Sequence, residues 1–443
     1  MASTQASSNT GDDPRSRRLR LRKANRQDVV PVQARLEDLL PQNHLARLIW
    51  GIVGCLDLSA FYAPIKAVEG EPGAPAIDPK ILITLWLYAI SQGVNSAREI
   101  DDLRVEHLAY IWICGGVSLN YHTISDFRTD HEEELDELMT QVIGRLDQVG
   151  LLELETQTQD GMRVRASAGA ASFRREPTLE KALEEARVLK DQVEHLGEDE
   201  SGKRTAREKA AQERAVRERV ERLETALGEM PAARAAKKPA DRDKARVSGT
   251  DPEARVMKMP DGGYRPAYNW QFSLELSNFI ITGVDAVNTG SDKAQMEPMI
   301  KQVIRRTGQI PKNWLIDGGF VKLTAIETVK GLGTIVFGPV PEPKDKTRDP
   351  YAPLATDSDI IAEWRRRMGT KEGKATYKQR SLAELPNAHA RNRYGIQQVR
   401  VRGRCKVRCI ALWVAITHNL LIWIRNLQQA ALSSSEQPQE VRS

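Results

Sequence analysis

Residues 152–168, LELETQTQDGMRVRASA, decide the fold prediction. Their side chains alternate in polarity, which is typical of a β-strand, and Asp160 with Gly161 predicts a tight turn or hairpin at its end. The same alternation returns in residues 268–275 (YNWQFSLE) and 279–287 (FIITGVDAV). These three segments therefore predict three strands of antiparallel type.

Helical and strand patterns then follow in turn. We expect a helix at 292–306, a strand at 313–317 (NWLID), a helix at 322–330, a strand at 333–337 (GTIVF), a helix containing Glu384 and a closing helix at 405–428. This order predicts a mixed α/β layer. The closing helix is too interrupted by polar residues for a span of about 20 apolar residues, so we expect it to be buried in the protein.

A highly charged segment interrupts the predicted sheet. In residues 176–230, 26 of 55 side chains are charged, and the apolar ones recur at steps of three and four. Two such stripes, one after the other, predict an antiparallel helical hairpin inserted after the first strand. We expect residues 231–250 to form a basic, mobile linker, so that the insertion spans 176–250.

Residues 30–150 contain several short helical patterns. The segment 79–91 has helical apolar spacing, and Ser96 with Glu99 forms a capping-box start for the next helix. Residues 123–126 (TISD) predict a cap for a helix that runs to about residue 144. Helix, turn and helix units are typical of DNA-binding modules, although a plain helical bundle has the same pattern.

Composition bounds the class of protein. The chain has 443 residues, 40% apolar and 28% charged, which fits two or three globular domains and excludes a collagen-like fibre or a wholly disordered chain. The N-terminus has no secretory pattern, so we expect a cytoplasmic protein without membrane association. Residues 1–29 and 429–443 are expected to be disordered tails.

Basic residues are concentrated in two regions. Residues 15–26 hold seven Lys or Arg and no acid, and residues 341–410 hold 17 basic and 8 acidic side chains. Such regions indicate binding to a polyanion, while each alone also fits a solvated surface.

Three carboxylates stand out by their positions. Asp160 and Asp317 end the first and fourth predicted strands, and Glu384 lies on a helix that can pack against the sheet. If the two strands are neighbours, both aspartates emerge at one end of the sheet, where three carboxylates can hold two Mg²⁺ or Mn²⁺ ions for phosphoryl transfer. Taken singly, each acid also fits a turn residue, a strand terminator or a helical partner of Arg380.

The spacing of Tyr377, Arg380, Glu384 and Arg391 resembles the Y-(2)-R-(3)-E-(6)-K signature of bacterial insertion-sequence DDE transposases. Further segments are similar to such enzymes: PQNHLARLIWGIVGCLDLSAFY near 41, DPKILITLWLYAISQGVNSAREI near 78, TDPEARVMK at 250, WLIDGGF at 314 and VRGRCKVRCIALWVAITHNLLIW near 401. The resemblance covers about residues 30–428.

The resemblance implies a ribonuclease H-like catalytic core, made of 151–175 and 251–428, behind a helical DNA-binding domain at 30–150. It also implies a metal-binding catalytic triad of Asp160, Asp317 and Glu384 that holds two Mg²⁺ or Mn²⁺ ions for DNA cleavage and strand transfer.

The implied partners are the terminal inverted repeats of the transposable element and its target DNA. A homodimer on DNA, in the bacterial cytoplasm at the nucleoid, is expected. Tyr377 and Arg380 would face the DNA backbone near the cut, with Arg391 in the lysine position. Arg128 flanks the presumed recognition helix and is a further candidate DNA contact, with surface solvation as its alternative.

The chain departs from the family pattern outside its carboxylates. Met162 replaces a threonine, Gly318 replaces an alanine and Phe320 replaces a tyrosine, so two hydroxyl groups are absent. Asp292 is a further acid near a strand end, but Asp317 is preferred because all of WLIDGGF matches the family. A catalytically inactive, transposase-derived DNA-binding protein and a metal nuclease that cuts without joining are the alternative functions.

Overall fold

The computed structural model describes residues 35–67, 75–195, 206–343 and 345–435. In that part of the chain a mixed sheet is formed by β1 (Thr156–Arg165), β4 (Arg255–Lys258), β5 (Tyr264–Glu275), β6 (Ile281–Val287), β7 (Asn313–Leu315) and β8 (Ile335–Phe337). The strand order is β4-β5-β1-β7-β8, and β6 also pairs with β5. β5 is antiparallel to β1, β4 and β6, whereas β7 is parallel to both of its neighbours, β1 and β8. The predicted mixed α/β layer is confirmed.

The register of β1 corrects one prediction. β1 pairs with β5 from Gln157 to Arg165, so Asp160 and Gly161 lie inside the strand and not in a turn. Because residues before and after this dipeptide pair with β5, its backbone stays extended. The parallel pairing of β1 with β7 ends at Thr158 opposite Leu315. The first and fourth predicted strands are therefore neighbours, which meets the condition for Asp160 and Asp317 to emerge at one end of the sheet.

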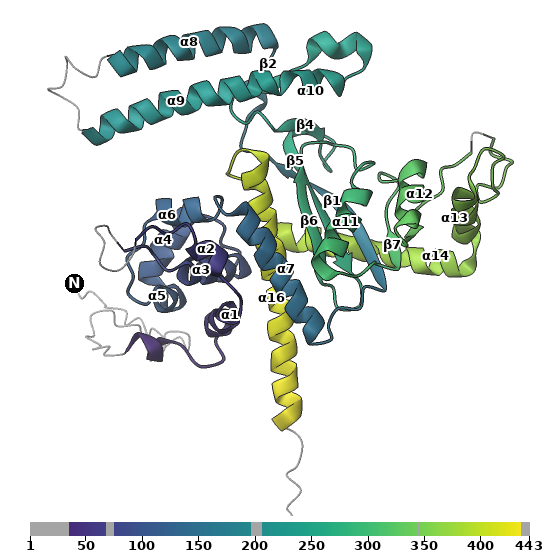
Figure 1. Ribbon diagram of the computed structural model, residues 1–443, viewed down its shortest axis with the longest axis horizontal. Coiled ribbons are helices and arrows are strands. Elements are labelled where there is room, and N and C mark those ends of the chain that lie inside the picture. The colour runs from purple at the N-terminus through teal and green to yellow at the C-terminus, as the bar shows by residue number, and fades with distance from the viewer. Residues whose placement is uncertain (1–34, 68–74, 196–205, 344, 436–443) are drawn as a thin grey trace, which may run out of the picture.

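In the described chain, a further set of α-helices follows β6. They are α11 (Met296–Thr307), α12 (Leu323–Gly331), α13 (Asp359–Gly369), α14 (Lys371–Lys378), α15 (Glu384–Ala388) and α16 (Arg404–Ser435). α16 runs past β6 and is drawn in yellow beside the sheet in Figure 1. In the described chain it alone is long and apolar enough to cross a membrane, but 83% of its most apolar window is buried. The expected buried closing helix is confirmed, although it is longer than predicted and includes residues 429–435 of the expected tail.

The N-terminal part is helical. Its α-helices are α1 (Leu45–Val53), α2 (Ser59–Tyr62), α3 (Pro79–Ser91), α4 (Ala97–Glu106), α5 (Leu108–Cys114), α6 (Tyr121–Phe127) and α7 (Glu132–Gln148). α3 has its predicted bounds, and Ser96 caps α4 as predicted. The cap predicted at 123–126 is wrong, because Asn120 accepts the hydrogen bond from the Thr123 amide and so starts α6 earlier. The basic segment at 15–26 and the rest of the tail at 1–29 lie outside the described residues.

One hydrophobic core joins the N-terminal helices to the sheet. Trp86 on α3 and Trp413 on α16 are both fully buried in it. The indole of Trp86 donates to the carbonyl of Ile124, and that of Trp413 donates to the carbonyl of Arg128. α16 therefore packs against the helical region on one side and the sheet on the other (Figure 1).

The predicted helical hairpin is confirmed. α8 (Glu176–His195) and α9 (Ala206–Gly228) lie side by side and extend away from the sheet (Figure 1). They share a separate apolar cluster. At their base, β2 (Phe173–Arg174) pairs antiparallel with β3 (Val247–Ser248), so the insertion begins and ends on adjacent strands.

The predicted mobile linker is wrong. Residues 231–250 contain most of α10 (Met230–Ala235), a 3₁₀ helix at Pro239–Lys244 and β3. Ala233, Ala245 and Val247 are buried in the apolar cluster of the hairpin. Basic composition suggested a solvated chain, but these few apolar side chains bury enough surface to order the segment.

Segment 250–258 (TDPEARVMK) ties the sheet to the start of α16. Asp251 is fully buried and accepts hydrogen bonds from the Tyr268 hydroxyl at 2.6 Å and the Gly403 amide at 3.1 Å. Glu253 accepts from the Arg404 amide at 2.8 Å. These hydrogen bonds hold the segment at 250–258 against the segment near 401, about 150 residues away, and they satisfy buried polar groups in both.

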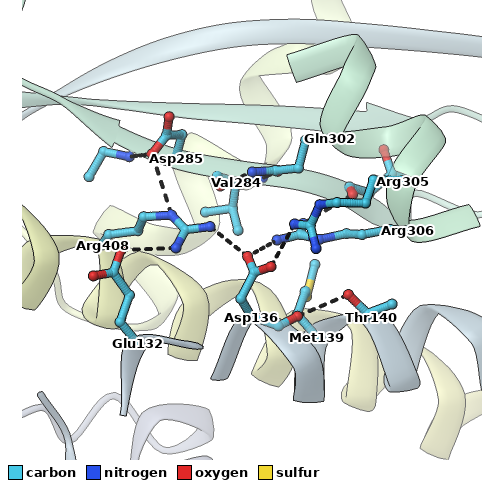
Figure 2. Close-up of polar contacts among 12 residues, drawn as sticks. Glu132, Asp136, Met139, Thr140, Val284, Asp285, Gln302, Arg305, Arg306 and Arg408 are labelled. Carbon is cyan, nitrogen blue, oxygen red and sulfur yellow. Dashed lines mark hydrogen bonds and ion pairs between the residues drawn. The ribbon is translucent and has the colours of Figure 1, made fainter. Parts of the chain in front are cut away.

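A buried ionic cluster joins three helices (Figure 2). Asp136 on α7 contacts Arg305 at 2.6 Å and Arg306 at 2.5 Å, both on α11, and Arg408 on α16 at 2.5 Å. Burial alone would raise the pKa of Asp136, but the three guanidinium groups lower it to about 2. Arg306 is only 5% exposed, so its charge depends on Asp136 for compensation.

Candidate active site

The structure brings the three predicted carboxylates together around Arg380. Its Nη2 atom lies 2.9 Å from Asp160 Oδ1 and 3.4 Å from Asp317 Oδ2, and its Nη1 atom lies 3.7 Å from Glu384 Oε1. Residues more than 200 positions apart in the sequence therefore share one guanidinium group.

Each carboxylate has a different backbone setting. Asp160 lies within β1, Asp317 lies two residues beyond β7, and Glu384 is the first residue of α15. The Gly319 amide donates to Asp317 Oδ1 at 2.7 Å, which turns the chain away from the sheet. The side chains are 13%, 41% and 72% exposed in the order Asp160, Asp317, Glu384. The site thus runs from the sheet interior to the surface.

Asp160 has the most perturbed environment of the three. Burial raises the pKa of its carboxyl to about 6, Arg380 opposes this rise, and the charges of Asp317 and Glu384 add to it. Its second oxygen, Oδ2, accepts a hydrogen bond from Asn387 Nδ2 at 2.9 Å. Both oxygens of Asp160 are therefore held, one by a charged donor and one by a neutral donor.

The donor set suits a hard divalent cation, because all three side chains offer carboxylate oxygens. As the side chains stand, no group of three His, Cys, Asp or Glu in the described chain is arranged to hold one ion. Arg380 supplies the positive charge between them instead. Metal binding at this site therefore requires Arg380 to move away from the carboxylates.

Tyr377 and Arg391 lie close along the chain to this cluster. Tyr377, on α14, is half-buried, and its pKa is raised by burial, with Arg380 opposing and Asp317 adding to the shift. Arg391 lies in a π-helical turn, His389–Arg393, and its side chain makes no hydrogen bond or ion pair with the described residues.

Arg128 lies in the interior, not at the predicted recognition surface. It is 8% exposed, its Nη1 atom donates to the Asn95 carbonyl at 2.7 Å, and its guanidinium lies 4.7 Å from the ring centroid of Trp86. Burial lowers its pKa to about 10. The contacts with Asn95 and Trp86 hold this cation away from the surface, so we do not expect Arg128 to contact DNA.

Asp292 lies on the face of β1 opposite to Asp160, and both of its carboxylate oxygens accept hydrogen bonds. It accepts from Asn269 at 2.6 Å, Gln271 at 2.7 Å and Arg163 at 3.2 Å. A β-carbon at Gly161 would lie within 2.9 Å of the Asn269, Gln271 and Asp292 side chains. This layer explains why glycine follows Asp160.

Two departures from the family pattern fill the core. Met162 is 1% exposed and Phe320 is fully buried, both in the main apolar cluster.

Asn387 was missed by the sequence analysis. Its position three residues after Glu384, on one helix face, was the available signal.

Two family models match the chain. The model described as "Transposase domain (DUF772)" matches residues 34–130, which contain α1 to α6, and the model described as "Transposase DDE domain" matches residues 240–420, which contain Asp317 and Glu384. Searches of curated proteins and of solved structures give no match. Both matched segments contribute side chains to the shared core, and they follow the order expected from the resemblance. The chain therefore belongs to the insertion-sequence DDE transposases.

Proposed function

We propose that the protein binds the ends of an insertion sequence and catalyses metal-dependent DNA cleavage and strand transfer by a DDE two-metal mechanism. The convergence of Asp160, Asp317 and Glu384 on Arg380 carries this proposal. Structural ion pairs usually match one acid to one base, whereas here three carboxylates meet one cation at a partly open edge of the sheet. An excess of negative charge at such an edge is what a metal site requires.

The strand arrangement supports a ribonuclease H-like core. Three antiparallel strands, β1, β5 and β6, are followed by β7 and β8, which continue the sheet on the other side of β1. Asp160 on the central strand and Asp317 after its parallel neighbour then face the same region. Glu384 is added from α15, which contacts β1 and β5.

The carboxylates would hold two Mg²⁺ or Mn²⁺ ions, which supply a Lewis acid and activate the attacking oxygen when bound. Asp160, held on the rigid strand, would fix the position of the site, while Asp317 and Glu384 would close it from more exposed positions. Arg380 would leave the carboxylates and turn toward a DNA phosphate, for which a guanidinium is well suited. Tyr377 and Arg391 would contact the DNA backbone beside it.

The remaining proposals follow from family membership and charge. The helical region 30–150 would bind the terminal inverted repeats, and a homodimer would hold two element ends and the target DNA. We place this activity in the bacterial cytoplasm, on nucleoid DNA.

Purified full-length protein with labelled DNA from the ends of its element tests the proposal. Mg²⁺-dependent nicking followed by strand joining is the expected result. DNA binding without cleavage would favour an inactive transposase-derived DNA-binding protein, and cleavage without joining would favour a metal nuclease. The inverted repeats in the DNA that flanks the gene identify the substrate to use.

A further inference from the structure

Asn387 makes a direct contact with the proposed metal site. Its Nδ2 atom donates to Asp160 Oδ2 at 2.9 Å, while Arg380 occupies Oδ1 of the same carboxylate. Only the NH₂ half of the amide can donate to a carboxylate, so this contact also fixes which way the amide faces.

The other half of the Asn387 amide is unusual. Its Oδ1 atom is buried and has no hydrogen-bond partner in the described chain. Leaving a buried acceptor unpaired is unfavourable, so the side chain is poorly explained by its contribution to folding alone. The contact with Asp160 is the one that accounts for an amide at this position.

Arg380 and Asn387, the two side chains that donate to Asp160, would respond differently to a bound cation. Arg380 is positive, so a divalent ion among the carboxylates would repel it and take its place. Asn387 is neutral and lies on the other oxygen, so it neither competes with the ion nor reduces the negative charge of Asp160. It can therefore remain in place when Arg380 leaves.

The position of Asn387 on α15 links two carboxylates. It follows Glu384 by three residues, and residues at this spacing lie on one helix face. The contact from Asn387 to Asp160 thus attaches the start of α15, and with it Glu384, to the central strand. Leu385, between them, turns away and lines a separate cavity with His389 and Arg393.

We propose that Asn387 is a positioning residue, which holds the Asp160 carboxylate and the start of α15 in place while the neighbouring cation changes from Arg380 to a metal ion. This inference rests on the proposed function. It predicts a role in metal affinity that is separable from folding and from DNA binding.

Calorimetric titration of full-length protein with Mn²⁺ tests the inference without any catalytic step. Asn387→Leu keeps the side-chain size but removes the donor, and should weaken Mn²⁺ binding about 10- to 100-fold, as loss of other hydrogen bonds to metal ligands does. Asn387→Gln, which keeps the amide, should recover part of that affinity. Asn392→Ala, at an exposed asparagine nearby, is the matched control and should bind as the wild type does.

A second measurement separates positioning from general structural damage. The Mg²⁺ concentration that gives half-maximal DNA cleavage should rise for Asn387→Leu, and saturating Mg²⁺ should restore most of the rate. The thermal midpoint and metal-free DNA binding should stay at wild-type values. If Asn387→Leu unfolds, Asn387→Ala with the same readouts takes its place.

The outcomes distinguish this inference from the proposed function. Loss of Mn²⁺ binding in Asp160→Ala, with wild-type Mn²⁺ affinity in Asn387→Leu, would overturn the role of Asn387 and leave the metal site intact. Unchanged Mn²⁺ binding in Asp160→Ala would overturn the metal site and the role of Asn387 together.

Discussion

The side chains of Asp160 and Glu384 contribute differently to the site, but both should be essential for catalysis. Asp160→Ala or Glu384→Ala should abolish DNA cleavage, by a factor of about 10³ or more, because each removes one carboxylate from the proposed metal site. DNA binding should be largely retained, since neither acid attracts phosphate. Gel-shift and cleavage assays on the same labelled element end measure both properties.

Glu372→Ala provides a control for these variants, because this glutamate is exposed on α14 and makes no hydrogen bond or ion pair in the described chain. It should cleave DNA at the wild-type rate. Cleavage that survives in Asp160→Ala or in Glu384→Ala would remove that residue from the metal site.

Gly161 shows why the residue next to Asp160 is restricted. A β-carbon there would lie 2.6 Å from Gln271 Nε2 and 2.7 Å from Asp292 Oδ1. Gly161→Ala should therefore destabilise the protein by about 1–3 kcal/mol through overpacking. Urea unfolding measures this change. Gly169→Ala, where a β-carbon has no neighbour within 4 Å, should change the stability much less.

The sequence identified the three carboxylates of the candidate site, but it did not predict the local structure around all of the candidate residues. Asp317 and Glu384 were found because their segments match a family and their positions after a strand and on a helix are local features. Asp160 was found for a partly wrong reason, since an Asp-Gly pair favours a turn unless a neighbouring strand pairs with it, as β5 does here. The interior position of Arg128 depends on packing against Trp86, which is not visible in local sequence.

At the scale of elements, α7, α11 and α16 depend on the ionic cluster around Asp136. Asp136→Asn should destabilise the protein by about 3–5 kcal/mol, because it leaves the buried Arg306 charge without its carboxylate. Thermal or urea unfolding checks this. Glu137→Gln, on the same helix but exposed, should have an effect of a few tenths of a kcal/mol.

The same carboxylate predicts a stability change in acid. The pKa of Asp136 is lowered to about 2 in the folded protein and is near 3.8 when the group is unperturbed, so its stabilising charge is fully present above pH about 4. This contribution, about 2 kcal/mol, is lost as the pH falls from about 4 to 2. Unfolding free energies measured through this range should fall less steeply in Asp136→Asn than in the wild type. Equal slopes would show that Asp136 does not have the lowered pKa.

Regular elements were predicted from their periodicity, and long-range pairings were not. α3 and the hairpin helices have strong apolar patterns, so local sequence identified them. The segment 231–250 was mistaken for a linker because its ordering depends on contacts with the hairpin, as for Val247. The Asp136 cluster joins charges up to 272 residues apart, and formal charge alone cannot pair them.

At the scale of the whole molecule, the helical hairpin is a separable unit. Its apolar cluster is distinct from the main core, and β2 and β3 bring Arg174 and Val247 into register at its base. Replacing residues 175–246 by an Asn-Gly turn should therefore leave the core folded, with a thermal midpoint within a few degrees of the wild type. We expect this variant to bind one DNA end but to lose the complex of two ends, because we propose that the hairpin supplies contacts between subunits.

Gel filtration of the protein with short element ends distinguishes the two assemblies. Paired ends that still form without residues 175–246 would exclude the hairpin as the contact between subunits. Unfolding of this variant would show instead that the hairpin supports the catalytic core.

The shared core around α16 has a practical consequence. A fragment that stopped after α7 would expose the apolar surfaces of α3 and α7 that α16 covers in the intact chain. Such a fragment would aggregate despite its many charged residues, because the exposed apolar surfaces would associate. The DNA-binding role that we propose for residues 30–150 is therefore better tested by point substitution in the full chain than by expressing that region alone.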